Sequence, residues 1–203
     1  MAKIKHTKTE LKAQKEALER YQRYLPMLQL KKQQLQSEIQ SITAQIKRTE
    51  GQIQQEWRSL DTWIEMFSED VELGKLLELQ KVETDEGNIA GVSIPVLKNV
   101  VMRKADYDLF ETPAWTDEAV EFLDKVIRLR VKRDILKEQR DRITRELRTT
   151  TQRVNLFEKV KIPECRENIR VIKIFLGEEQ TAAVVRGKIA KSRTLEYEYE
   201  DAA

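Results

Sequence analysis

The stretch from residue 11 to residue 53, LKAQKEALERYQRYLPMLQLKKQQLQSEIQSITAQIKRTEGQI, decides the fold. Every seventh position from residue 11 to residue 67 is apolar except Lys32, and these apolar residues are Leu11, Leu18, Leu25, Ile39, Ile46, Ile53, Leu60 and Phe67. A companion set three residues further along contributes Tyr21, Leu28, Leu35, Ile42 and Trp63. A heptad repeat of this length predicts a helix that supercoils in a left-handed sense with a partner helix.

A second heptad pattern follows Pro113. Thr116 is a candidate N-cap, and Asp117 and Glu118 would place negative charge in the first helical turn. The apolar positions of this second run are Phe122, Val126, Leu129, Leu136, Ile143, Leu147, Val154 and Phe157. The run therefore predicts a second long helix with its own apolar seam.

The second seam has two irregularities. Arg133 and Arg140 interrupt one of its two sets of positions, and the phase slips near Pro163. Beyond the slip, spacings of three and four continue through Ile162, Cys165, Ile169, Ile172 and Leu176. We therefore expect Pro163 to bend this helix without ending it.

The two runs are of similar length, which favours a helical hairpin. We expect helices over residues 7–83 and 116–190 that fold back antiparallel about residue 100. Two residues whose numbers add up to about 200, such as Leu60 and Arg140, would then be neighbours. Residues 61–72 carry five acids and no base, whereas residues 128–139 carry five bases and two acids. Opposite charges beside a seam set the register and orientation of a coiled coil, although two independent solvated faces are the alternative.

The predicted fold class is therefore all-α. It consists of a long antiparallel two-helix coiled coil, formed by the N- and C-terminal helices, with a small β-hairpin-containing middle segment at one end. We expect residues 1–203 to form a single elongated domain, in which residues 84–115 form the tip segment and residues 191–203 a flexible tail.

The middle segment is rich in β-branched residues from residue 92 to residue 102, VSIPVLKNVVM. This composition predicts two short strands, with Lys98 and Asn99 as a candidate turn. Pro95 restricts its strand to an edge or to irregular pairing. So small an element cannot bury all of its apolar side chains, and we expect it to contact a partner through Ile94, Val96, Val100 and Val101.

Composition excludes several classes of protein. Charged residues make up 35% of the chain, glycines number only 6, and the formal net charge is +2, which argues against a nucleic-acid-binding surface. Cys165 is the only cysteine, so an internal disulfide cannot form and a reducing cytoplasm is the expected compartment. No apolar window is long enough for a membrane span, and the first eight residues, MAKIKHTK, lack the apolar core of a signal peptide.

The sequence also offers little for catalysis. It contains no glycine-rich phosphate-binding motif and no G-x-S-x-G motif. His6 is expected to be solvent-exposed, and Cys165 lies on the apolar phase, where a packed thiol is favoured over a nucleophile. The acids Glu65, Glu69 and Asp70 have the spacing of a solvated helix face. We therefore predict no catalytic residue, no cofactor and no metal site.

Two stretches resemble a known family. Residues 153–163, RVNLFEKVKIP, followed by ENIRVIKIFL, resemble a pattern in the C-terminal helix of the D subunit, the central rotor shaft of V-type (vacuolar and archaeal-type) ATPases and ATP synthases. Residues 7–35, TKTELKAQKEALERYQRYLPMLQLKKQQL, are similar to the N-terminal helix of that family. The motif positions to which the resemblance assigns partner contacts are Arg153, Asn155, Glu158 and Pro163.

The resemblance implies a non-catalytic shaft that couples ATP hydrolysis or synthesis to rotation of a membrane ring and to transport of H⁺ or Na⁺. Its paired helices would enter a hexamer of catalytic and nucleotide-binding subunits. The small F subunit of the stalk would bind beside the shaft, and a funnel-shaped subunit would connect the middle segment to the proteolipid ring. The protein would then be cytoplasmic and peripheral to the membrane, in the soluble sector of the complex.

Two other classes also use coiled coils. A prefoldin-like chaperone subunit combines an antiparallel coiled coil with a small β-element, but its helices are much shorter. A tethering or cytoskeletal adaptor requires only the coiled coil, and it leaves the RVNLFEKVKIP match unexplained. These two classes are the alternatives to the rotor shaft.

Overall fold

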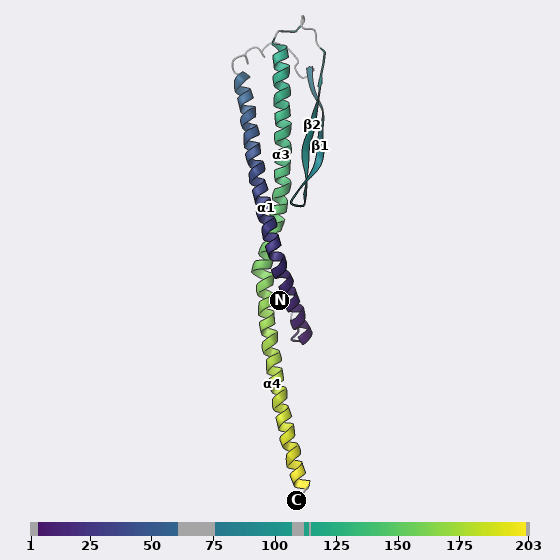
Figure 1. Ribbon diagram of the computed structural model, residues 1–203, viewed down its shortest axis with the longest axis vertical. Helices are drawn as coiled ribbons and strands as arrows, with labels where there is room; N and C mark the ends of the chain where they lie inside the picture. Colours follow the sequence, from purple (N-terminus) through teal and green to yellow (C-terminus); the bar gives the residue numbers. More distant parts are fainter. Residues whose placement is uncertain (1–3, 61–75, 107–111, 114, 202–203) are drawn as a thin grey trace. The chain divides into compact units, whose positions relative to one another are not determined.

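The computed structural model describes residues 4–60, 76–106, 112–113 and 115–201 of the chain. Its elements, in order, are α1 (Lys8–Leu60), β1 (Leu77–Ile89), β2 (Val92–Lys104), α3 (Thr116–Leu156), the π-helix η2 (Phe157–Lys161) and α4 (Ile162–Asp201). Long N- and C-terminal helices with an antiparallel two-stranded hairpin between them confirm the predicted fold class (Figure 1).

The chain divides into two units, which are described separately. The hairpin unit consists of Lys31–Thr150 and contains both strands. The terminal unit consists of Met1–Leu30 and Thr151–Ala203. Each unit contains a part of α1 and a part of the long C-terminal helix, so both test the predicted seam.

Helices α1 and α3 are antiparallel in the hairpin unit, because Lys31 lies against Glu146 whereas Trp57 lies against Phe122. The buried core between them is drawn from the heptad positions and from one strand residue: Leu35, Ile42, Ile46, Ile94, Leu136 and Ile143. Heptad spacing puts these side chains on one stripe of each helix, where they are removed from water together. The two predicted seams are confirmed here.

The register of the helices differs from the expected one. Lys31 contacts Glu146, and Trp57 contacts Phe122. In a hairpin that folds back about residue 100, the partner of each α1 residue would lie about twenty positions later in the sequence than the partner observed. The expected pairing of Leu60 with Arg140 is therefore wrong. The reason is that α1 does not continue to residue 83: residues 77–83 belong to β1, so the chain turns back earlier.

The acidic stretch that was expected to face residues 128–139 lies outside the described residues. Within the described part of the chain, the basic stretch contacts other groups. Lys137 pairs with Glu50 at 3.0 Å, and Arg128 donates to the backbone carbonyl of Val100 at 3.0 Å. The basic stretch thus forms an ion pair with α1 and a hydrogen bond with the hairpin, at positions set by the shorter helix.

The hairpin turn lies at Ala90 and Gly91, and the prediction of a turn at Lys98 and Asn99 is wrong. Both turn residues have positive φ, 50° and 81°, as a type I′ turn requires. The Asn88 side chain stabilises the turn by accepting the Gly91 N–H at 2.9 Å. Lys98 is instead the extra residue at a register shift, opposite the step from Glu83 to Thr84.

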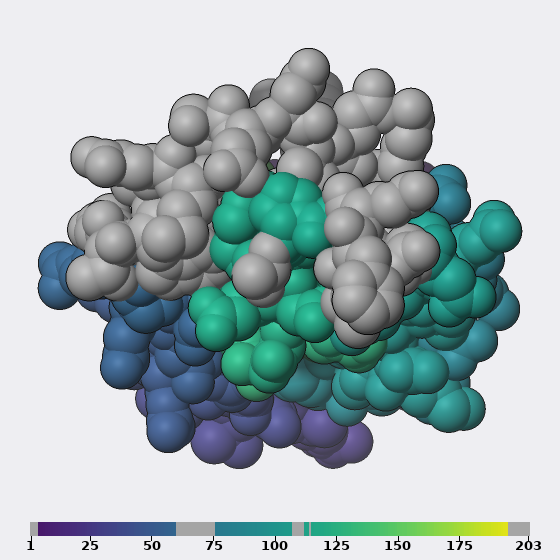
Figure 2. Space-filling model, turned by 90° about the horizontal axis from the view of Figure 1, so that it is seen from above, coloured from purple at the N-terminus to yellow at the C-terminus, as the bar shows by residue number. Residues whose placement is uncertain are grey.

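The hairpin lies along α3 and not beyond the ends of the helices. Ile94 of β2 belongs to the core formed by α1 and α3, and Gln139 and Arg142 of α3 donate to the Pro95 and Ser93 carbonyls. Seen end-on, the start of α3 lies between α1 and the hairpin (Figure 2). The middle segment was expected at one end because the chain was expected to fold back about residue 100, but its Ile94 packs into the core of α1 and α3.

The terminal unit pairs the first part of α1 with the region around η2 and α4. Tyr21 contacts Phe157 with ring centroids 5.0 Å apart, Gln14 accepts a hydrogen bond from Asn168, and His6 contacts Phe175, so the two helices are antiparallel here too. The buried side chains that follow Thr150 are Val154 of α3 and Ile162, Cys165 and Ile172 of α4. Those residues confirm the predicted shift of phase around Pro163.

The C-terminal helix is unbroken in backbone through Pro163, but its local geometry changes. The Ile162 N–H bonds to the Phe157 carbonyl, five residues back, which defines η2. Proline lacks an N–H, and its ring clashes with the carbonyl four residues earlier in a regular α-helix. A wider π-turn directly before Pro163 accommodates both properties, where a simple bend was expected.

Two predicted boundaries are wrong. Thr116 is the first residue of α3 and not its cap: Trp115 accepts the first helical hydrogen bond, from the Ala119 N–H. The Thr116 hydroxyl is buried and makes no hydrogen bond to the first N–H groups of the helix. At the other end, α4 continues to Asp201, although residues 191–203 were expected to form a tail. The Lys, Arg and Glu of this segment are good helix formers, which favours the longer helix.

Candidate interaction surface

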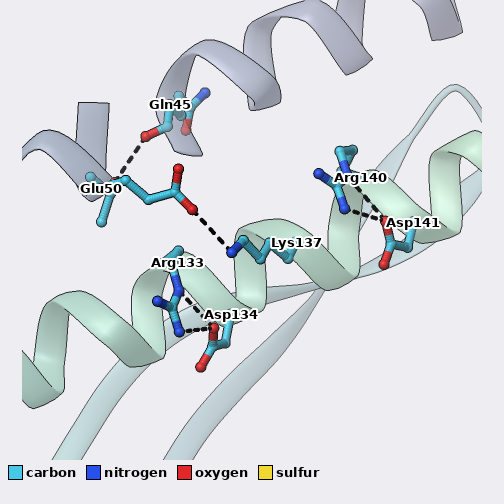
Figure 3. A network of polar contacts seen from close by, with 8 residues as sticks. Gln45, Glu50, Arg133, Asp134, Lys137, Arg140 and Asp141 are labelled. Atoms are coloured by element: carbon cyan, nitrogen blue, oxygen red, sulfur yellow. Dashed lines mark hydrogen bonds and ion pairs between the residues drawn. The ribbon is translucent and has the colours of Figure 1, made fainter. Parts of the chain in front are cut away.

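The outer surface of the helix pair in the hairpin unit is a network of charged groups (Figure 3). The Lys137 ammonium lies 3.0 Å from the Glu50 carboxylate and connects α3 with α1. Directly before Glu50, the buried Thr49 hydroxyl donates to the Gln45 carbonyl at 2.9 Å, so a polar side chain enters the seam without an unpaired donor. The seam is mainly apolar inside, with the Thr49 hydroxyl paired, and an ion pair lies along its border.

Arg133 and Arg140, which interrupt the second seam, are half-buried and pair with neighbouring carboxylates. Arg133 bonds to Asp134 at 2.7 Å and Arg140 bonds to Asp141 at 2.8 Å, each through two guanidinium nitrogens (Figure 3). Half-exposed arginines paired with neighbouring carboxylates need not bury a charge. The heptad can therefore tolerate them at the cost of a narrower apolar stripe.

Several carboxylates and cations are paired within a single helix. The hydrogen bond and charge of Lys125 lower the pKa of Glu121, and Glu121 raises the pKa of Lys125 in return. Glu164 likewise raises the pKa of Lys161. These shifts keep each group in its charged form near neutral pH, which suits a solvated surface and not general acid or base catalysis.

Cys165 is buried in the terminal unit and directly follows Glu164 in sequence. Burial raises the pKa of its thiol, and the negative charge of Glu164 adds to the rise. A protonated and buried thiol is a poor nucleophile. The prediction of a packed cysteine is confirmed by its burial.

The structure separates the four predicted contact residues of the hairpin into two groups. Ile94 is 3% exposed and Val100 is also buried, so both belong to the interior of the chain. Val96 is 41% exposed and Val101 is half-buried. Only the latter two have side-chain surface that a partner could reach without displacing the hairpin.

The four predicted motif residues around η2 are all exposed: Arg153, Asn155, Glu158 and Pro163. Arg153 and Asn155 lie on either side of the buried Val154, so their exposure follows from the helical repeat. Glu158 lies in the first turn of η2, and Pro163 follows that π-helix. The motif thus combines a buried stripe with polar groups on both sides of it.

A family model described as the D subunit of ATP synthase matches residues 10–192, which include both helices and the hairpin. The chain belongs to this family. A V-type ATP synthase D subunit from Borreliella burgdorferi is 47% identical over 192 residues, covering 95% of each chain. Similar proteins of the same description from Chlamydia pneumoniae and Chlamydia caviae are 33% and 31% identical, covering 94% and 95% of this chain and 92% and 94% of theirs.

Membership of the D-subunit family confirms the resemblance seen in the sequence. The RVNLFEKVKIP stretch and the N-terminal helix both lie within the matched residues. The match also covers the hairpin, which lies outside the two stretches that carried the resemblance.

Sequence reasoning missed an exposed apolar stripe on α1 of this member of the D-subunit family. Tyr24, Met27 and Leu30 are spaced three residues apart and are 53%, 63% and 65% exposed. Leu156 and Val160, one on each side of Phe157, are exposed as well. These five residues are apolar but lie outside the heptad phase, and that mismatch is the sequence signal by which they could have been found.

The end of α4 carries a second exposed surface. Every residue from 177 to 194 is exposed, including Val184, Val185 and Ile189. Eighteen helical residues span about 27 Å, and no described side chain of the terminal unit covers them. A helix that is exposed all round gains little from burial within its own chain.

Neither a metal-binding cluster nor a membrane-spanning helix is found among the described residues. Within residues 4–60, 76–106 and 115–201, histidine, cysteine and acidic side chains do not gather in groups of three or more that could hold a metal. Among the described helices, none has both the length and the apolar character that crossing a bilayer requires.

Proposed function

We propose that this chain is the central rotor shaft of a V-type ATP synthase or ATPase. In this role it is non-catalytic and couples ATP hydrolysis or synthesis in a catalytic hexamer to rotation of a membrane ring and to transport of H⁺ or Na⁺. The observation that carries the proposal is the D-subunit family match over residues 10–192.

The architecture supports this role. A shaft that transmits torque must resist unwinding, and the apolar seam between α1 and α3 joins two helices at several levels along their length. The ion pair of Lys137 with Glu50 adds a polar connection at the border of the seam. Two helices that are packed in this way resist twisting better than a single helix does.

The partners of the proposed shaft follow from its surfaces. The exposed residues 177–194 of α4 are the segment that we propose to enter the hexamer of catalytic and nucleotide-binding subunits. The exposed motif residues Arg153, Asn155 and Glu158 would contact the hexamer or the small F subunit of the stalk. Val96 and Val101, on the hairpin, are available to the funnel-shaped subunit that connects the shaft to the ring. In this arrangement the chain is cytoplasmic, in the soluble sector of the complex.

The composition of the complex tests the proposal directly. The complex would be purified through a tag on this chain and weighed by native mass spectrometry. We expect one copy of the chain with a hexamer of two alternating large subunits and one small partner. A small hexamer of coiled-coil chains, or a complex without ATPase subunits, would contradict the rotor assignment and favour the prefoldin-like or adaptor alternative.

Cross-linking tests the rotor role itself. In a Cys165→Ala background, Val184→Cys in α4 would be linked by a bifunctional maleimide to a cysteine placed in a catalytic subunit. This link should stop ATP hydrolysis, because a shaft fixed to the hexamer cannot rotate. Gln14→Cys with Asn168→Cys is the matched control: these side chains are hydrogen-bonded across α1 and α4, so their link joins the shaft to itself and should leave hydrolysis intact.

A further inference from the structure

The two strands of the hairpin differ in how their outward backbone groups are satisfied. The pair beside the turn, Ile89 and Val92, exchanges backbone hydrogen bonds, and hydrogen-bonded and non-hydrogen-bonded pairs alternate from there. Residues of the non-hydrogen-bonded pairs direct their N–H and C=O groups away from the other strand. On β2 these residues include Ser93 and Pro95, and their partners on β1 are Asn88 and Glu86.

The outward groups of β2 are covered by α3. Three side chains of α3 donate to its carbonyls: Arg142 to Ser93, Gln139 to Pro95 and Arg128 to Val100. At two of these outward positions of β2, no backbone N–H is free to bond to another strand. Pro95 has no N–H, and the Val100 N–H is bonded to the Asn99 side chain at 2.9 Å. β2 therefore has an edge that is already occupied within the chain.

No described residue bonds to the outer edge of β1 in this way. Alternation from the turn directs the backbone N–H and C=O groups of Asn88, Glu86, Thr84 and Val82 away from β2. The extra residue of the register shift, Lys98, lies on β2, so the alternation along β1 is not interrupted there. No described residue donates to or accepts from these four outward N–H and C=O groups. The side chains of Thr84, Glu86 and Asn88 are also exposed. About 20 Å of strand edge thus has no hydrogen-bond partner among the described residues.

The open edge is acidic. β1 carries four acids and one base: Glu78, Glu83, Asp85, Glu86 and Lys81. Glu83 is paired with Lys81 at 3.3 Å, and Asp85 is paired with Lys98 at 3.7 Å. Glu78 and Glu86 have no ion-pair partner among the described residues. Glu86 lies within the open edge, so a strand that pairs there would gain from a basic side chain opposite this carboxylate.

We propose that the outer edge of β1, residues 82–88, receives an extended lysine- or arginine-bearing segment of another polypeptide as a third strand. The inference rests on the proposed function in one point: the added strand is expected to belong to another subunit of that complex. Main-chain hydrogen bonds to the four outward positions supply the binding, and opposite charges select the partner.

The charge of the edge also decides against a second copy of this chain. Antiparallel pairing of β1 with β1 places acids opposite acids, and like charges directly opposite each other destabilise a sheet. The same charges protect the free chain from edge-to-edge aggregation. An edge that repels itself and is open to a basic strand is selective for a different partner.

Hydrogen exchange of the backbone amides tests the third strand in the intact complex. The outward amides of Val82, Thr84, Glu86 and Asn88 should exchange at least about tenfold more slowly in the tag-purified complex than in the isolated chain. The inward amides of Asp85 and Gly87 are bonded in both samples and serve as internal controls. Equal exchange of the outward amides in the two samples would overturn the proposal.

Cross-linking and two variants at one position identify the occupant. A photoreactive side chain at Thr84 should link to a lysine- or arginine-rich peptide of another subunit, whereas a link to a second copy of this chain or to lipid would refute the proposal. Glu86→Pro removes one outward N–H without removing a ladder bond and should abolish most of the protection of the neighbouring outward amides. Glu86→Gln keeps that N–H and removes only the charge, so it should weaken protection less.

The two proposals can fail separately on the same sample. The masses of the purified subunits test the rotor assignment, and the exchange of β1 amides tests the third strand whatever the subunits are. If Glu86→Pro unfolds the hairpin, which circular dichroism of the isolated chain would reveal, the exchange measurement on the unaltered chain decides.

Discussion

Replacement of Ile94 by alanine tests how the hairpin is attached to the helices. Ile94 is the buried hairpin residue in the cluster that also contains Leu35 and Ile42 of α1 and Ile143 of α3. If the hairpin is held chiefly by this side chain, Ile94→Ala should destabilise the isolated chain itself, before any partner is considered.

The magnitude follows from burial. Ile94→Ala removes three carbon atoms from a side chain that is 3% exposed. At about 0.8 kcal/mol for each buried carbon, the transfer term is about 2.4 kcal/mol. Incomplete collapse of the cavity adds to this, and the total expected loss is about 3 kcal/mol.

Val96→Ala is the matched control. It lies two residues further along the same strand, so it removes β-branching in the same local context, but its side chain is 41% exposed. Two carbon atoms that are a little more than half buried give an expected loss of about 1 kcal/mol.

Urea unfolding of the isolated chain, followed by circular dichroism, would measure both variants against the unaltered protein. The difference in unfolding free energy between Ile94→Ala and Val96→Ala should be about 2 kcal/mol. Equal losses for the two variants, or an Ile94→Ala loss below about 1 kcal/mol, would refute the attachment of the hairpin through its buried face.

Three further predictions concern polar groups. Gln139→Leu leaves the Pro95 carbonyl without its donor and should lower the unfolding free energy by about 1–3 kcal/mol, whereas an unchanged urea midpoint would contradict the described contact. A double-mutant cycle on Lys137 and Glu50, whose side chains are 39% and 42% exposed, should give a coupling energy below about 1 kcal/mol that declines with added salt. The pKa of Cys165 is raised by burial above its usual 9.0, so the neutral thiol stabilises the fold below that pH and this contribution declines as pH rises through the raised pKa. Alkylation of Cys165 at pH 8 should accordingly be slow in the native chain and much faster in urea, and equal rates would show that the thiol is accessible.

The heptad pattern alone determined which faces of the helices are buried. Leu35, Ile42 and Ile46 on α1, and Leu136 and Ile143 on α3, were all selected by spacing, and all are buried. This succeeds because a helix turns by a fixed angle per residue, so sequence distance translates directly into direction around the axis. The family was also readable from sequence, because the motif positions of the C-terminal helix lie in one continuous stretch.

The candidate contact residues were predicted less well. Ile94 and Val100 were selected for partner contact because they are β-branched and lie in a small element, yet both are buried. A strand pattern shows which residues share a face, but it does not show what covers that face. The exposed Tyr24, Met27 and Leu30 were overlooked because attention to the heptad leaves out the apolar residues between its positions.

The sequence by itself determined the two seams, the helical class and the family, because each depends on local periodicity or on contiguous residues. Only the tertiary structure decided where the hairpin turns, which helix residues face each other and which strand edge is free. Those features depend on contacts between residues far apart in the chain: Ala90 and Gly91 turn where Ile94 can enter the core of α1 and α3, and α3 then satisfies β2 and leaves β1 open.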